Sequence, residues 1–144
     1  MDVLTQIAAF EGRRSQAYPD PLTGGAPWTI GCGHTGPDVH EGACWSDDQI
    51  DAALRSDVDK ADFACQVAFD WYFGLNEPRR AVLVNMAFQM GINGLLAFKN
   101  TLAVVRDERF EDAAESMRQS EWAKQTPTRA RALAAQMATG EWQT

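Results

Sequence analysis

The sequence predicts an α+β fold that is mostly helical, and three features support this expectation. Residues 17–34 are rich in proline and glycine around short extended pieces, which is typical of a small β-hairpin. Residues 50–69 carry apolar side chains at helical spacing, and residues 78–88 are apolar almost all round, as in the central helix of a bundle. A small β lobe and a larger helical lobe follow from this pattern.

The first helix is expected over residues 2–10, with Gly12 ending it. Leu4, Ile7 and Glu11 fall at i, i+3 and i+7, so Glu11 lies on the stripe that faces the core. The hairpin segment follows, and its clearest strand is expected over residues 28–34.

A long helix begins after Ser46 with several signals at once. Ser46 is the expected N-cap, Gln49 closes a capping box, and Asp47 and Asp48 bring acids into the first turn. The apolar stripe then continues for about 20 residues, which predicts one amphipathic helix. Its members are Ile50, Leu54, Val58, Ala61, Cys65 and Phe69.

The remaining chain is expected to be helical. Asn76 and Pro78 start the central helix and Gly91 ends it. Shorter helices are expected over residues 94–106, 109–118 and 127–137, the last with Thr126 as N-cap. We expect a single domain, 1–144, with a small lobe of about residues 13–46, a connecting helix of about 47–69, and a helical lobe of about 70–144 plus helix 1–11.

Composition narrows the classes of function. With 45% hydrophobic residues, 144 residues are enough for one buried core, and nothing calls for a cofactor. The net charge of −7 argues against nucleic-acid binding, because phosphate binding needs a basic face, and predicts weak steering toward an anionic surface.

Residues 81–98 carry no charge, but amides and glycines interrupt them, so a buried helix is expected there and not a membrane span.

The cysteines are expected to be reduced. Cys32, Cys44 and Cys65 are odd in number, and the first residues lack the basic and apolar regions of a secretion signal. We therefore expect no disulfide, and synthesis in the cytoplasm.

Two carboxylates stand where the first helix gives way to the hairpin, Glu11 and Asp20. Burial along the core-facing stripe is expected to raise the pKa of Glu11, whereas Asp20, between Pro19 and Pro21, is expected to stay hydrated and ionised. One acid and one base at neutral pH are the groups that cleave a glycosidic bond. The simpler alternatives are a solvated acid at a helix end for Glu11 and a turn-forming acid for Asp20.

Several motifs, in order along the chain, resemble the phage-type lysozyme (endolysin) family of glycoside hydrolases, most of all its T-even phage branch. Singly each motif is weak, whereas together they are specific. The resemblance covers roughly residues 1–35 and 79–142. The motifs are Glu-Gly at 11–12, Tyr-Pro-Asp at 18–20, Thr-Ile-Gly-Cys-Gly-His at 29–34, Asn-Met-Ala-Phe-Gln-Met-Gly at 85–91 and Gln-Thr-Pro-Thr-Arg-Ala at 125–130.

The resemblance implies a lysozyme-like fold whose two lobes enclose a cleft. It also implies hydrolysis of the β-1,4 bond between N-acetylmuramic acid and N-acetylglucosamine in peptidoglycan, which lyses the host cell. In this family Glu11 would be the general acid, Asp20 the carboxylate that activates water, and Thr29 the residue that positions this water. Because the family resembles inverting glycosidases, the two carboxyl groups are expected about 6.5–9.5 Å apart.

The same resemblance assigns supporting residues. Gln89 would line the substrate cleft with support from Trp122, and Arg129 would reach the catalytic Glu11. A guanidinium there would lower the pKa of Glu11 against the effect of burial, so the net direction stays open. The alternative for Arg129 is a surface position, and Asn85 is as well explained by a structural role.

His34, in the third motif, is expected to have a structural role. The family pattern pairs His34 with an acid on the long helix, for which Asp57 is the best match, and the pair is expected to be an ion pair outside catalysis.

The chain departs from the family between Asp20 and Thr29. Eight residues separate the two, whereas five is the family's commoner spacing. The longer loop leaves the interval between Glu11 and Asp20 unchanged, but it leaves the orientation of Thr29 open. Leu22 and Trp28 would add contact surface for sugar or peptide.

Three other functions compete with the endolysin. A lytic transglycosylase needs Glu11 alone, so Asp20 argues against it, and a catalytically silent wall-binding module would be free to lose both acids. A zinc amidase or peptidase would use Cys32, His34, His40 and Cys44, but the Cys-x-His start departs from the usual ligand spacing, so no metal is expected.

The family also implies partners and a place of action. The expected partner is a peptidoglycan glycan strand, bound by a monomer that inserts into no membrane. The protein would wait in the host cytoplasm until a holin opens the inner membrane, and would then act on the cell wall in the periplasm.

Overall fold

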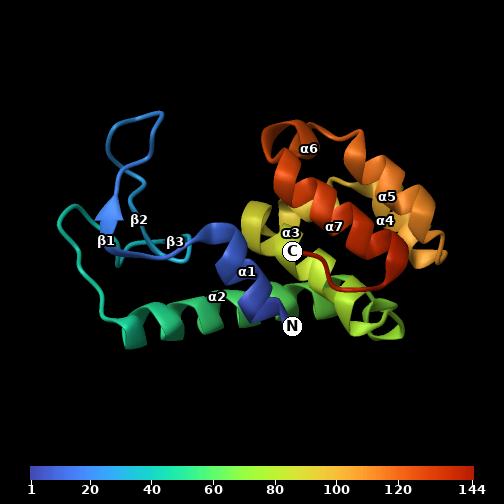
Figure 1. Cartoon of the computed structure of the whole chain (residues 1–144), viewed down its shortest axis with the longest axis horizontal. Helices are drawn as coiled ribbons and strands as arrows, with labels where there is room; N and C mark the ends of the chain where they lie inside the picture. The colour runs from blue at the N-terminus through green and yellow to red at the C-terminus, as the bar shows by residue number, and fades with distance from the viewer. The chain divides into compact units, whose positions relative to one another are not determined.

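The computed structural model describes residues 1–144 and is α+β and mostly helical, as predicted (Figure 1). The elements in chain order are α1 (Val3–Glu11), β1 (Arg14–Tyr18), β2 (Thr29–Gly31), β3 (His34–Thr35), α2 (Asp47–Ala68), the 3₁₀ helix η1 (Tyr72–Gly74), α3 (Glu77–Leu96), α4 (Lys99–Arg106), α5 (Phe110–Arg118), α6 (Glu121–Gln125) and α7 (Pro127–Thr139).

The chain divides into two compact units. One is Leu4–Lys60, and the other consists of Met1–Val3 with Ala61–Thr144. Helix α2 begins in the first unit and ends in the second. Most of α1 therefore groups with the sheet, whereas the sequence favoured grouping this helix with the later ones.

The sheet has three antiparallel strands in the order β1-β2-β3. The expected single strand over residues 28–34 is wrong, because β2 ends at Gly31 and β3 begins at His34. Gly31 and Gly33 have φ angles of 66° and 77°, a left-handed conformation that glycine adopts without steric cost. These two glycines turn the chain back, so that Ile30 pairs with His34.

The sheet covers a small apolar cluster of the first unit. Its buried members are Ile30, Val39 and Ala43, and the partly buried side chains packed against them are Ala17, Trp28 and Trp45. A short pairing between Gln16 and Cys44 brings the segment before α2 alongside β1. The cluster therefore supports the strands on either side of the loop that contains Asp20.

Helix α2 has the predicted start. The Ser46 N–H donates to Gln49 Oε1 at 2.8 Å, and the Gln49 N–H donates to Ser46 Oγ at 3.2 Å, which confirms the capping box. The predicted apolar stripe is also confirmed, because all six of its members are buried: Ile50, Leu54, Val58, Ala61, Cys65 and Phe69.

Helix α3 is the centre of the second unit, and every residue from 81 to 87 is buried. Asn76 caps it by accepting a hydrogen bond from the Arg79 N–H at 3.1 Å. Gly91 interrupts the helix with φ 77° and ψ 162°, but helical structure then resumes to Leu96. The predicted end at Gly91 therefore holds only for the first part of α3.

Helix α7 packs against α5, α3 and α6 (Figure 1). Thr126 is the N-cap residue of α7, as predicted, but its hydroxyl donates to the Trp122 carbonyl at 3.0 Å and makes no capping bond. That carbonyl belongs to α6, a helix of five residues that the sequence did not predict.

None of the helices is long and apolar enough to cross a membrane by itself. Helices α3 and α4 reach that length and hydropathy only when taken together, and they are bent by 102° with respect to each other.

Arg79 joins α3 to the last turn of α7. Its Nε donates to the Met137 carbonyl at 2.8 Å and its Nη2 to the Ala138 carbonyl at 3.0 Å. The guanidinium also lies 3.6 Å from the centre of the Phe110 ring, and burial lowers the pKa of Arg79. The last carbonyls of a helix have no partner within the helix, so Arg79 supplies the missing donors.

Substitution of Arg79 by Lys is expected to lower the free energy of unfolding by about 1–3 kcal/mol, because lysine keeps the charge but not the paired donors. Urea unfolding measures the change. Arg131, an exposed arginine of α7, provides the matched control, and Arg131→Lys should stay within about 0.5 kcal/mol of the wild type. Equal losses in both variants would contradict the role given to Arg79.

Candidate active site

Glu11, Asp20 and Thr29 all belong to the unit Leu4–Lys60. Glu11 is the last residue of α1, Asp20 follows β1 by two residues, and Thr29 opens β2. Tyr18 is paired with Thr29 in the sheet, although the register of β1 on β2 shifts between Arg14 and Tyr18. Asp20 and Thr29 therefore emerge at the same end of the β1–β2 ladder.

The carboxylate of Glu11 lies against the backbone of Gly33. A β-carbon placed on Gly33 would be 2.6 Å from Glu11 Oε2, a separation at which one of the two must move. Glu11 itself is half-buried, and Gly12 ends α1 with its N–H on the Ala8 carbonyl at 3.0 Å. The absence of a side chain at residue 33 thus makes room for the carboxylate, a role that the sequence analysis missed although the Gly-x-Gly pattern marked the position.

The carboxylate of Asp20 is held by the loop that follows it. Its Oδ1 accepts a hydrogen bond from the Leu22 N–H at 2.7 Å, and Oδ2 makes no hydrogen bond within the protein. Asp20 is half-buried at the base of an exposed loop. One oxygen is therefore fixed by the backbone, and the other is available to a water molecule or a substrate.

His34 is bonded on both ring nitrogens. Nδ1 lies 2.6 Å from Asp57 Oδ2 on α2, and Nε2 lies 3.1 Å from Asp38 Oδ1. Burial of the ring opposes protonation, but the hydrogen bonds to the two carboxylates outweigh it and raise the pKa of His34. The bond to His34 in turn lowers the pKa of Asp38. Asp38 is a partner that the sequence analysis did not identify.

Arg129 is buried in the first turn of α7, with 9% of its surface exposed, so a surface position is wrong for this residue. Its Nη2 donates to Asn85 Oδ1 at 3.3 Å, and the Asn85 amide donates to the Ala81 carbonyl at 2.9 Å. Asn85 is completely buried on α3. The two polar side chains are therefore partners in the second unit, and Asn85 has the structural role that the sequence left open.

Gln89 and Trp122 are also partners in this unit. The indole Nε1 of Trp122 donates to Gln89 Oε1 at 2.9 Å, which joins α3 to α6. The Trp122 ring meets the Phe98 ring edge to face, with centroids 6.2 Å apart. Gln89 and Trp122 were predicted from the family motifs, whereas Phe98 was not.

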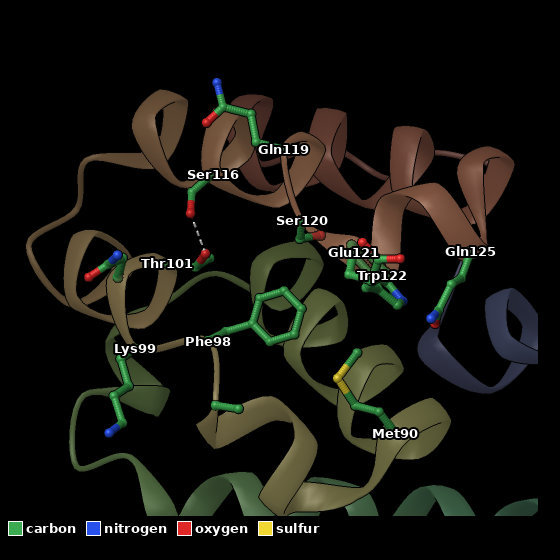
Figure 2. Close-up of a pocket in the computed structure, with 12 residues that line it drawn as sticks. Met90, Phe98, Lys99, Thr101, Ser116, Gln119, Ser120, Glu121, Trp122 and Gln125 are labelled. Atoms are coloured by element: carbon green, nitrogen blue, oxygen red, sulfur yellow. Dashed lines mark hydrogen bonds between the residues drawn. The ribbon is translucent and has the colours of Figure 1, made fainter.

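A hollow of about 770 Å³ opens beside Trp122. Figure 2 shows Phe98, Met90 and Trp122 around the same space, with the Thr101 and Ser116 hydroxyls, 2.6 Å apart, also in the lining. The walls combine aromatic rings with amides, hydroxyls and one residue of each charge. Such a surface suits a ligand that carries apolar faces and many hydrogen-bonding groups. The complete lining is Met90, Ala97, Phe98, Lys99, Asn100, Thr101, Ser116, Gln119, Ser120, Glu121, Trp122 and Gln125.

The cysteines and histidines do not converge on a metal site. No group of three or more His, Cys, Asp or Glu side chains has the geometry to bind a metal ion. His34 is engaged by two carboxylates, and His40 Nδ1 lies 3.0 Å from the Glu41 carbonyl. All three cysteines are free. Cys44 is exposed, whereas burial raises the pKa of Cys32 and raises that of Cys65 to about 12.

Comparison with known proteins identifies a family. A family model described as phage lysozyme matches residues 8–138. Over 140 residues, 92% of this chain, the sequence is 31% identical to peptidoglycan hydrolase gp36 of Pseudomonas phage phiKMV, of which the match covers 15%.

Two further relatives match over a shorter region. Over 69 residues, 48% of this chain, the sequence is 36% identical to probable T4-type lysozyme 1 of Dictyostelium discoideum, with 41% of that protein covered. Probable T4-type lysozyme 2 of the same organism is 33% identical over 69 residues, with the same coverage. The matched regions span less than half the length of each of these relatives.

Replacement of His34 by Asn is expected to make the free energy of unfolding less dependent on pH. Because the pKa is higher in the folded protein, the stabilisation is complete below the unfolded value of about 6.5 and is lost as the pH rises through the raised pKa. We expect the wild type to exceed His34→Asn by about 1–3 kcal/mol near pH 6, and by less at pH 9.

Urea unfolding at several pH values measures this difference. The control is His40→Asn, because His40 is an exposed histidine of the same unit. The difference in free energy of unfolding between His40→Asn and the wild type should not show the pH dependence expected for His34→Asn. If the difference in free energy of unfolding between the wild type and His34→Asn grew toward high pH, it would contradict the ion pairing assigned to His34.

Proposed function

Because the chain belongs to the phage lysozyme family, we propose that it is an endolysin that hydrolyses the β-1,4 bond between N-acetylmuramic acid and N-acetylglucosamine in bacterial peptidoglycan. The observation that carries the proposal is the setting of the two carboxylates. Glu11 lies against Gly33, while Asp20 is tied by one oxygen beside the first residue of β2.

Glu11 is the proposed general acid, which gives its proton to the oxygen of the bond that breaks. The contact with Gly33 supports this role, because a carboxyl group that lies against backbone has little freedom to turn away from a fixed leaving group. Proton donation by a positioned acid lowers the barrier to departure of the sugar.

Asp20 is the proposed base. Its Oδ1 is occupied by the Leu22 N–H, so Oδ2 would take a proton from the attacking water. Thr29, at the same end of the ladder, would position this water through its hydroxyl. Attack from the face opposite the leaving group inverts the anomeric carbon, and a carboxyl separation of about 6.5–9.5 Å would leave room for the water.

Substrate binding is assigned to residues of the second unit. Gln89 is proposed to line the substrate cleft with support from Trp122, whose indole Nε1 donates to Gln89 Oε1. Trp122 also lines the mixed polar and aromatic hollow. Arg129 is proposed to support the catalytic acid, as the family resemblance implies; its buried guanidinium donates to Asn85 Oδ1.

The oligomeric state of the protein and its place of action in the cell are proposed from the family. The protein would act as a monomer, pass from the host cytoplasm through a lesion made by a phage holin, and lyse the cell by degrading peptidoglycan in the periplasm. The net charge of −7 predicts that binding to an anionic wall depends on contacts with the glycan more than on long-range attraction.

A lytic transglycosylase is the second candidate. It would use Glu11 alone and let a hydroxyl of the sugar attack, so the products would carry an anhydro ring. The tethered carboxylate of Asp20 favours hydrolysis, because this second mechanism has no need of a base beside Thr29.

Substitutions Glu11→Gln and Asp20→Asn should each lower the rate of peptidoglycan hydrolysis by at least about 10²-fold, because each removes a group that transfers a proton. Mass analysis of soluble muropeptides measures both rate and product. Glu111→Gln, at an exposed acid of α5, is the matched control and should keep full activity. NMR of the first product should show the α-anomer if the reaction inverts.

Two outcomes would contradict this proposal. Anhydro products that persist in Asp20→Asn would establish the transglycosylase. An absence of soluble products from a folded wild-type protein would favour the wall-binding module.

Substitution Gly33→Ala is expected to lower activity by about 10-fold or more, because the new methyl group would displace the Glu11 carboxylate and strain a left-handed residue. Gly74→Ala is the matched control, since a β-carbon there meets nothing within 4 Å. Rates are compared at a temperature where both variants are folded by circular dichroism. Equal activity in the two variants would show that the position of Glu11 does not depend on Gly33.

A further inference from the structure

The loop between Asp20 and Thr29 is not held in place by packing. All residues from 21 to 27 are exposed except Gly25, which is half-buried. Leu22, the one large apolar side chain among them, is 94% exposed and therefore contributes no packing. The conformation of the loop therefore depends on its own hydrogen bonds and on the restricted φ angles of Pro21 and Pro27.

Three of these bonds involve Asp20. The Asp20 N–H donates to the Gly25 carbonyl at 2.9 Å, and the Gly24 N–H donates to the Asp20 carbonyl at 2.8 Å. The Leu22 N–H donates to the carboxylate Oδ1 at 2.7 Å. The loop thus closes on Asp20, and the direction of the carboxylate depends on where the loop places the Leu22 amide.

The hydroxyl of Thr23 makes two further bonds. It donates to the Ala26 carbonyl at 2.7 Å and accepts from the Gly25 N–H at 3.2 Å. Gly25 is therefore bonded on both sides, with its amide on Thr23 and its carbonyl on the Asp20 amide. Through Gly25, the Thr23 hydroxyl is connected to the backbone of Asp20.

We propose that Thr23 is a positioning residue for the reaction: its hydroxyl fixes the exposed loop so that the Leu22 amide orients the Asp20 carboxylate toward the attacking water. This inference rests on the proposed function, in which Asp20 is the base. Because the exposed loop lacks packing contacts, the Thr23 hydroxyl is one of the few groups that fix it.

The test is Thr23→Val, which keeps the shape of the side chain and removes both hydrogen bonds. Initial rates on soluble, uncross-linked peptidoglycan strands should show kcat lowered by about 5- to 20-fold, as expected for a loss of one or two hydrogen bonds that matter in the transition state. KM should stay within about 2-fold, because the role proposed for the Thr23 hydroxyl is to orient the base and not to bind substrate. Thr23→Ser, which restores the hydroxyl, should return kcat to near the wild-type value.

Thr139 offers a matched control in the other unit. Its hydroxyl donates to the Ala135 carbonyl at 2.9 Å and accepts from the Glu141 N–H at 3.2 Å, and the residue is exposed like Thr23. Thr139→Val removes the same two kinds of bond without touching the loop, so its kcat should equal that of the wild type.

The outcomes separate this inference from the proposed function. If Asp20→Asn is inactive but Thr23→Val has the wild-type kcat, the inference is overturned and the function stands. A rise in KM alone, a failure of Thr23→Ser to recover, or an equal loss in Thr139→Val would also overturn it. Full activity of Asp20→Asn would overturn both, because Asp20 would then not be the base.

Discussion

The turn from Gly31 to His34 is the constraint on which the first unit depends. A β-carbon on Gly31 would lie 3.3 Å from Ile50 of α2, and one on Gly33 would collide with the Glu11 carboxylate at the end of α1. His34 then bonds Asp57 of α2. One short turn therefore contacts α1 and contacts α2 in two places, and only left-handed glycines let the chain approach both helices so closely.

The elements that could be predicted from the sequence are those determined by residues close together in the chain. The capping box of α2 involves residues three apart, and its buried stripe follows from helical spacing, so both could be identified before any contact was known. The break between β2 and β3 was missed because Thr and Ile favour a strand, although the left-handed Gly31 and Gly33 that turn the chain are a local signal in the sequence. Helix α6 was missed because five residues are too few to show a period.

The candidate site likewise has residues that could be predicted from the sequence and contacts that could not. The acids and Thr29 could be identified from a motif, because their residue types and order are visible in the chain. The space beside Gly33 could not, since the Glu11 carboxylate that occupies it belongs to another element. The surface alternative for Arg129 failed for a similar reason: its partner Asn85 lies on another helix. Asp38 is only four residues from His34, but it lies outside any helix or strand and no motif marks it. The hollow beside Trp122 is assembled from α3, α4, α5, α6 and the segment before α4, and no single segment indicates it.

The three thiols have a practical consequence for chemical labelling. Cys32 and Cys65 are buried, and burial disfavours the thiolate that reacts with maleimides and disulfides. Cys44 is exposed, and its backbone is paired with Gln16 of β1. The unmodified chain therefore carries one addressable attachment point for a fluorophore or a spin label, fixed to the sheet by its backbone and located in the unit that holds Glu11 and Asp20.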